Sequence, residues 1–331
     1  MIYFKRQLIA HYSLFICILL FGCVEQNGLK KVKIGLSHSQ NHSFTQALEY
    51  FDSLLQKRLP EKFEIEIYHS AILGSEKEMQ EMLTLGTLEG AVTGLLNNYD
   101  PVFAIFEMPY LYRDRKHVFK VFNGEIIQKV TKPLQERGIV FLGFYENGFR
   151  HITNSVKPIN KPSDLSGMLI RTPENPAYLN TFKAMDAIPT PMSFSELYTA
   201  LLQGVVDGQE NPLQNIWFGR LYEAQKNIAL TAHIYNTAYM LFSKRFWDSL
   251  NSEEKIIFKE CVAESTLWQM EYMKQLDKSL ESKLKEKGMT FTYPDRAAFE
   301  EQSKPAYEKM YLQLGDRARN IVQEIKNIQT P

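Results

Sequence analysis

Residues 205–212, VVDGQENP, place two carboxylates and two side-chain amides within one short turn. Asp207 and Glu210 are close enough in sequence to be considered as an acid–base pair. That chemistry needs pKa values pushed apart and a substrate between the two groups, and the neighbouring sequence provides neither. A metal site would need further clustered oxygen ligands. Because Asp-Gly is a common turn pair, we predict turn chemistry here rather than catalysis, with Gln209 and Glu210 holding the loop in place.

Motifs for catalysis or cofactor binding are absent from the sequence. No Gly-rich phosphate loop follows a strand, and neither His-Glu-x-x-His nor Gly-x-Ser-x-Gly occurs. The seven histidines show no metal-ligand spacing. We therefore expect no enzyme activity, no catalytic residue, no cofactor and no bound metal.

Three polar residues stand where apolar strands end. Arg150 follows the apolar run 139–145, and Arg171 ends the strand in MLIRTP. Asn211 follows Val205 and Val206. In open α/β sheets, ligands bind at the carboxyl ends of strands. A buried arginine there needs an anionic partner, and its guanidinium fork suits a carboxylate. Together these three side chains favour a carboxylate-binding site. The alternative is that the two arginines lie at the surface or in salt bridges and bind no ligand.

Strands must alternate with helices to bring these residues together. Strands are expected over 32–36, 63–67, 139–145, 168–172 and 205–206. Helices are expected to begin at three capping boxes, residues 43–46, 75–78 and 193–196. The run 139–145 is continuously apolar, which is typical of a strand buried on both faces of a parallel sheet. This order predicts an α/β fold with mixed, mostly parallel sheets.

One helix is predicted to be too long for a single domain. Residues 251–287 contain no proline or glycine, and Gly288 follows them. Glu253 and Glu254 lie in the first turn and lysines near the end, as the helix dipole prefers. A helix of about 36 residues would span about 54 Å. We expect a strut across two domains, with a kinked pair of helices as the alternative.

The length and charge of the chain restrict its class. A chain of 331 residues is long enough for two domains. Lys+Arg and Asp+Glu both number 38, and no basic stripe is visible, so nucleic acid is not an expected partner. Cys261 lies in a helical pattern and is expected to be a core residue.

The N-terminus has the layout of an export signal. Lys5 and Arg6 precede the mostly apolar run 8–21, which is too short for a membrane span. Residues 20–23, LFGC, resemble a bacterial lipobox, so residues 1–22 are expected to be a lipoprotein signal peptide with Cys23 lipidated. An ordinary cleaved signal is the alternative. Residues 23–31 would then form a linker.

Several ordered blocks resemble the solute-binding proteins of TRAP transporters, the DctP type. The run 189–212, PTPMSFSELYTALLQGVVDGQENP, resembles the family's signature block. Similar blocks occur throughout the mature chain, at 73–92, 106–114, 148–176, 223–233 and 246–254.

The resemblance implies a two-domain periplasmic-binding-protein type II-like fold that closes over a small organic acid. Domain one would hold 32–147 and 237–276, and domain two 148–236 and 277–331. Such proteins work in the periplasm and deliver their ligand to a membrane permease of small and large subunits. A binding protein that feeds a sensor kinase is an alternative.

The resemblance also implies a set of ligand-binding residues. The family's main carboxylate-clamping arginine falls on Arg171, its second arginine on Arg150 and its ligand asparagine on Asn211. The loop after the first strand, around Ser37 and His38, usually adds a contact.

One departure from the family pattern bears on the ligand. Where sialic-acid-binding members carry a glutamate, this chain has Gly94, so sialic acid is not expected. The segment RTPENPAY is similar to members that take sugar acids such as uronates or aldonates, and Glu174 and Asn175 could bond sugar hydroxyls. C4-dicarboxylates are the competing ligand class.

Overall fold

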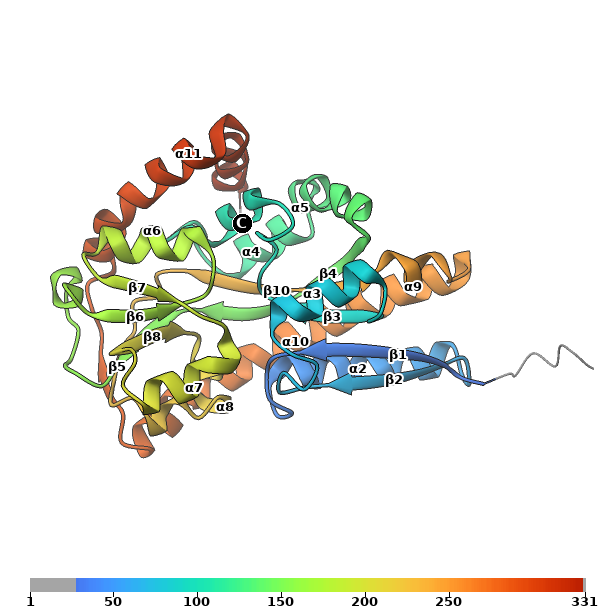
Figure 1. Cartoon of the computed structure of the whole chain (residues 1–331), viewed down its shortest axis with the longest axis horizontal. Coiled ribbons are helices and arrows are strands. Elements are labelled where there is room, and N and C mark those ends of the chain that lie inside the picture. The colour runs from blue at the N-terminus through green and yellow to red at the C-terminus, as the bar shows by residue number, and fades with distance from the viewer. Residues whose placement is uncertain (1–27, 330–331) are drawn as a thin grey trace, which may run out of the picture.

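The computed structural model describes residues 28–329, which form two β-sheets flanked by helices (Figure 1). Five of the nine strand pairings are parallel and four are antiparallel, so both sheets are mixed. The predicted α/β class is confirmed.

The first sheet has five strands in the order β2-β1-β3-β10-β4. Its strands are β1 (Lys30–Leu36), β2 (Phe63–Tyr68), β3 (Gly90–Thr93), β4 (Ile139–Phe149) and β10 (Tyr235–Ser243). Alternate residues of β10 enter different apolar clusters: Tyr239 packs on one face of the sheet and Met240 on the other. Both faces are therefore covered.

The second sheet has six strands in the order β11-β9-β5-β8-β6-β7. Its strands are β5 (His151–Asn154), β6 (Leu169–Thr172), β7 (Ile188–Pro191), β8 (Gly208–Asn211), β9 (Asn227–Ala229) and β11 (Thr290–Thr292). Two smaller clusters cover its faces, because neighbours in β9 point opposite ways: Ile228 enters one cluster and Ala229 the other.

The helices cover these four faces. The α-helices are α2 (Ser43–Arg58), α3 (Glu76–Leu85), α4 (Arg115–Phe122), α5 (Glu125–Thr131), α6 (Pro176–Ala184), α7 (Phe194–Leu202), α8 (Leu213–Phe218), α9 (Lys244–Asp248), α10 (Ser252–Glu286) and α11 (Arg296–Asn327). Short 3-10 helices are η1 (Pro101–Glu107), η2 (Lys132–Arg137), η3 (Pro162–Leu165) and η4 (Leu221–Glu223).

Helix α10 is the predicted strut. It is continuous over 35 residues, and Asn251 and Glu254 form a capping box at its start. Phe258 and Cys261 pack in a cluster of the first sheet, whereas Leu284 packs in a cluster of the second. In Figure 1, α10 passes behind the strands of the first sheet.

The end of the chain contacts both parts of the molecule. Phe299, early in α11, packs with the second sheet, whereas Ile321 and Ile325 pack with the first. A kink at Gly315, where φ is +70°, separates the two halves. The division of the chain into domains, with 277–331 in domain two, stays a prediction.

Three local predictions are wrong. Val205 and Val206 form a bend and the strand begins only at Gly208, so Gln209 and Glu210 lie in a strand and not in the predicted loop. The reason lies in tertiary structure: β8 fits between β5 and β6, and Asp207 ends the bend by accepting a hydrogen bond from the backbone N–H of Leu169.

The other two wrong predictions concern α2 and β4. The N-cap of α2 is His42, not Ser43, because the Ser43 hydroxyl is used in a bond to Gln214 on α8. Strand β4 lies at the sheet edge and pairs antiparallel with β10 rather than in a parallel interior. Its apolar run is buried because α10 and the α4–α5 region pack on its two faces.

Candidate functional site

A cleft lies between the two sheets, where several strands end. It is lined from the first sheet by the loops after β1 and β3, and from the second by residues after β6, β7 and β8. All six residues predicted to bind a ligand line it: Ser37, His38, Arg150, Arg171, Glu174 and Asn211. The cleft is thus placed where strand ends of open α/β sheets bind ligands.

Arg171, on β6, presents a buried charge to this cleft. Its side chain is only 2% exposed. The guanidinium donates through Nε and Nη2 to the carbonyl oxygen of Met192, at 3.0 and 2.7 Å, and to no carboxylate of the described residues. Burial lowers the pKa of Arg171 to about 10. The charge is therefore held in place without being neutralised.

Arg150 differs, because its charge is already matched. It sits at the junction of β4 and β5, and its Nε and Nη2 donate to the two carboxylate oxygens of Glu210 at 2.5 and 2.7 Å. Burial alone lowers the pKa of Arg150, but the Glu210 carboxylate raises it above the ordinary value. The guanidinium also lies over the Tyr178 ring, 5.1 Å from its centroid. Arg150 thus forms part of a rigid wall.

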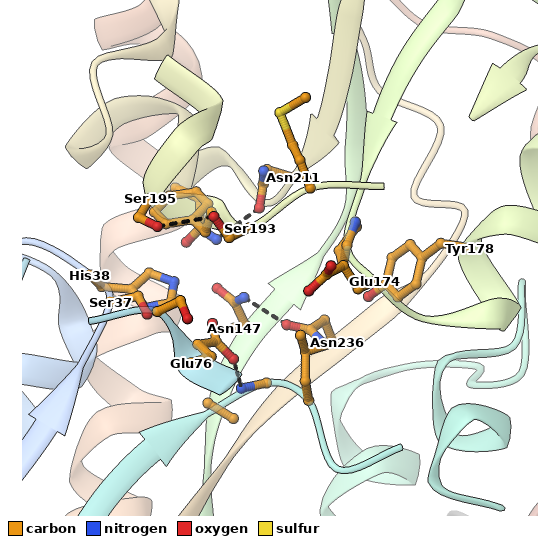
Figure 2. A pocket seen from close by; sticks show the side chains of 18 of the residues that line it. Ser37, His38, Glu76, Asn147, Glu174, Tyr178, Ser193, Ser195, Asn211 and Asn236 are labelled. Atoms are coloured by element: carbon orange, nitrogen blue, oxygen red, sulfur yellow. Dashed lines mark hydrogen bonds between the residues drawn. The ribbon is translucent and has the colours of Figure 1, made fainter. Parts of the chain in front are cut away.

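Asn211 is fixed at the end of β8. Its Nδ2 donates to Gln209 at 2.5 Å, and its Oδ1 accepts from Asn215 at 2.9 Å. His42, on the other side of the cleft, bonds Asn215 at 2.8 Å. This chain of bonds positions the Asn211 amide at the cleft, and Figure 2 shows it on one wall.

Ser37 and His38 enter the cleft from the loop after β1. The Ser37 hydroxyl and His38 Nδ1 are buried and have no hydrogen-bond partner among the described residues. The His38 ring stacks on Phe194 from across the cleft, with centroids 5.0 Å apart. Burial lowers the pKa of His38 well below its ordinary value, so its imidazole is neutral. Both groups need a partner, because an unpaired buried polar group is costly.

Glu174 lies at the mouth of the cleft. Its side chain is exposed, and its carbonyl oxygen accepts from Asn97 Nδ2 at 3.1 Å. Its neighbour Asn175 is buried and turns away to Glu107. Figure 2 shows Glu174 near Tyr178, on the side of the cleft away from His38.

Two acidic residues in the cleft were not found by sequence reasoning. Glu107 accepts from Asn236 at 2.5 Å and from Asn175 at 3.0 Å, and burial raises its pKa to about 8. Glu76 accepts from the Thr93 hydroxyl at 2.6 Å and from the Gly94 N–H at 2.9 Å, and burial raises its pKa. A single acid closing an apolar run, as Glu107 does in FAIFEMP, is the signal that could have found the first.

The strut helix α10 joins two sheets, and the cleft between the sheets contains Arg171, which has no carboxylate partner among the described residues. This arrangement defines a two-domain binding protein for small anions. The family model for bacterial extracellular solute-binding protein, family 7 (DctP), matches residues 34–314. The chain belongs to this family, the solute-binding proteins of TRAP transporters.

Known relatives agree with this assignment. The chain is 33% identical to a solute-binding protein of Verminephrobacter eiseniae over 290 residues, 87% of each chain. It is also similar to a TRAP solute-binding protein from Polaromonas sp. JS666 bound to D-erythronate, at 33% identity and TM-score 0.87, covering 91% of this chain and 100% of that one. A Haemophilus influenzae protein with bound L-gulonate shares 32% identity and TM-score 0.85, covering 89% and 98%.

Family membership confirms several expectations. Proteins of this family are non-enzymatic components of transporters that work outside the cytoplasm, and they bind small acids. None of the helices within 28–329 is both long and apolar enough to cross a membrane. Cys23 and the predicted signal peptide lie outside the described residues.

Proposed function

We propose that this protein captures a small organic acid, with a sugar acid such as a uronate or aldonate favoured, and delivers it to the small and large permease subunits of a TRAP transporter. The ligand carboxylate docks on Arg171, and the two domains close over it. The observation that carries this proposal is the buried Arg171 guanidinium, whose only acceptor among the described residues is a backbone carbonyl. A ligand carboxylate would supply the missing anion through two parallel hydrogen bonds.

The other wall residues have supporting roles. Arg150 is paired with Glu210, so it shapes the cleft wall and adds to the electrostatic potential there without offering a free charge to the ligand. Asn211 offers its amide beside Arg171, because β8 and β6 are neighbouring strands. Ser37 and His38 meet the far part of the ligand, where their unpaired polar atoms accept or donate hydrogen bonds.

The dimensions of the cleft favour a small ligand. Its volume is about 60 Å³, and an ordered water needs roughly 10–15 Å³ on this measure. The space therefore suits an acid of a few carbons better than a bulky sialic acid. The similar proteins with bound D-erythronate and L-gulonate support the sugar-acid preference. C4-dicarboxylates stay the second candidate, since Arg171 suits any carboxylate.

A thermal-shift screen of the chain without residues 1–22 tests this proposal. Aldonates, uronates, C4-dicarboxylates and sialic acid are each added at millimolar concentration. A ligand at one hundred times its Kd stabilises the folded state by about 2.7 kcal/mol, so the melting temperature rises clearly. If no organic acid raises it, the proposed function is wrong. If the neighbouring genes encode a membrane kinase rather than permease subunits, the delivery step is replaced by sensing.

We also propose that Cys23 is lipidated and anchors the protein to the membrane. The support is the LFGC sequence at residues 20–23. In cells labelled with a radioactive fatty acid, the wild-type protein should carry label and sediment with membranes. The Cys23→Ser variant should lose both properties, and an unlabelled wild type would indicate a simple cleaved signal.

A further inference from the structure

Within residues 28–329, Arg171 is the one buried cation of the cleft that has no carboxylate partner. Arg150 is neutralised by Glu210, whereas Arg171 contacts only a carbonyl oxygen among the described residues. Lys77 is exposed at the mouth. The acids that line the cleft, none of them in a salt bridge with a described residue, are Glu76, Glu107 and Glu174. Arg171 is therefore the buried cation available to one ligand carboxylate, and a second carboxylate would find no other buried cation free among the described residues.

Glu107 is the most firmly held of these acids. It ends η1 and is 3% exposed. Asn236, at the start of β10, donates to its Oε1, and Asn175, the N-cap of α6, donates to its Oε2. These bonds hold the carboxyl from both sides of the cleft. In Figure 2, Asn236 lies between His38 and Tyr178, and Tyr178 is on the side of the cleft away from His38. Because Glu107 accepts from Asn236 and Asn175, we place it on the Tyr178 side.

Among the residues that the structure describes, no free cation pairs with Glu107. The charged groups nearest to it are Arg150 and Glu210, which neutralise each other. The remaining titratable groups around it are the tyrosines Tyr112, Tyr178 and Tyr239. Burial raises the pKa of Glu107 to about 8, so its carboxyl can both donate and accept near neutral pH and becomes an anion in mild base.

Two neutral groups line the opposite side of the cleft. The Ser37 hydroxyl and His38 Nδ1 have no partner among the described residues, and ligand hydroxyl groups would satisfy both. A ligand without hydroxyls would leave them unpaired.

We infer that Glu107 is a specificity-determining residue, which pairs with ligand hydroxyls and, once ionised, rejects acids that bring a second carboxylate against it. The inference rests on the proposed function, with the first carboxylate on Arg171. A hydroxyl pairs with Glu107 in either protonation state. A second carboxylate would meet no cation there and would repel Glu107 whenever both are ionised.

Matched acids test the inference, because each pair differs only in its terminal carbon. D-erythronate is compared with meso-tartrate, and D-galactonate with galactarate. Dissociation constants are measured by calorimetry at pH 9, where Glu107 is ionised. We expect the wild type to bind the monocarboxylate of at least one pair at least tenfold more tightly than its diacid. Glu107→Gln should narrow that ratio by at least tenfold.

Glu49→Gln is the control, since Glu49 is exposed on α2 and the change removes the same charge. It should leave the ratio unchanged. If Glu107→Gln folds poorly, the wild type alone decides: its ratio should widen between pH 6 and pH 9. The inference is overturned if the wild type binds each diacid as tightly as its monocarboxylate, or if it binds neither monocarboxylate. It is also overturned if Glu107→Gln and Glu49→Gln show the same ratio of diacid Kd to monocarboxylate Kd. Failure of the proposed function would differ, because then no organic acid would bind at all.

Discussion

At the scale of single residues, Arg150 and Arg171 differ in whether a carboxylate pairs with the guanidinium. Both are buried arginines at strand ends that line the same cleft. The Glu210 carboxylate occupies the fork of Arg150, whereas Arg171 donates only to the carbonyl of Met192 among the described residues. A buried guanidinium without an anion is costly for the ligand-free protein. Ligand binding offsets that cost, which is why Arg171 is the residue to change first.

Arg171→Lys should weaken ligand binding. A lysine ammonium cannot form the two parallel hydrogen bonds of a guanidinium. We expect a Kd at least about tenfold higher, equivalent to about 1.4 kcal/mol, in calorimetry with the best acid of the thermal screen. Arg220→Lys is the control, because Arg220 is exposed and pairs only with Glu223. Equal affinities of the wild type and Arg171→Lys would contradict the clamp.

Glu107 should make the stability of the protein depend on pH. Its pKa is about 8 in the folded chain and 4.5 ordinarily. Between these values the folded state binds more protons than the unfolded state, so stability falls as pH rises, by up to about 1.4 kcal/mol per pH unit. Glu107→Gln cannot titrate and should show a flatter profile in urea unfolding from pH 5 to pH 8. Parallel profiles of wild type, Glu107→Gln and the Glu49→Gln control would contradict the shifted pKa.

The site residues differ in how visible they are in the sequence. Arg171 could be predicted because an apolar strand precedes it and a proline follows. The pairing of Arg150 with Glu210 could not, since it depends on the alignment of β5 with β8. Glu107 contacts Asn175 and Asn236, which are far away in sequence, so its place in the cleft follows from the closed fold alone.

At the scale of elements, β8 is unusual because a polar sequence, GQEN, is fully buried at the centre of a sheet. Each polar side chain has a partner: Gln209 donates to Thr153, Glu210 accepts from Arg150, and Asn211 bonds Gln209. Satisfied buried networks of this kind specify one arrangement of the surrounding groups. The strand thus aligns the wall that holds the ligand.

Gly208→Ala should destabilise the protein. A Cβ at Gly208 would lie 2.2 Å from the carbonyl oxygen of Thr153, closer than real contacts allow. We expect a loss of about 1–3 kcal/mol, the usual range for overpacking, measured by urea unfolding. Gly94→Ala is the matched control, because a Cβ there would find its nearest neighbour at 3.7 Å. A Gly208→Ala variant as stable as Gly94→Ala would contradict the tight packing of β8 against β5.

Elements with strong local signals could be predicted, and elements set by their neighbours could not. Helix α10 could be predicted because its sequence lacks glycine and proline and has a cap at Asn251. The turn before β8 could not, because Val205 and Val206 have high strand propensity but are excluded from the sheet, where Gly208 begins the pairing. Tertiary context overrides propensity in short segments.

At the scale of the whole molecule, the two halves are joined by hydrogen bonds across the cleft as well as by the chain. His42 at the start of α2 bonds Asn215 on α8, and Ser43 bonds Gln214 at 2.7 Å. An opening of the cleft that separates α2 from α8 would break these bonds. They therefore bias the balance between open and closed forms.

Asn215→Ala should shift that balance toward the open form. The change removes two buried hydrogen bonds, one to His42 across the cleft and one to Asn211. Each is worth about 0.5–1.5 kcal/mol, so ligand affinity should fall by at least about two- to tenfold. Small-angle X-ray scattering should show a larger radius of gyration without ligand. Asn320→Ala, at an exposed position of α11, should match the wild type. An unchanged radius and affinity in Asn215→Ala would show that these bonds do not contribute to closure.

The strand order also sets when the protein can fold during synthesis. Strand β3 pairs with β10, through Val92 and Met240, and β10 follows nearly the whole second sheet in the chain. The first sheet therefore cannot be completed until most of the polypeptide has been made, and such distant pairings form slowly. Late completion leaves the first sheet without two of its strands, β10 and the edge strand β4 that pairs with β10, until β10 has been made.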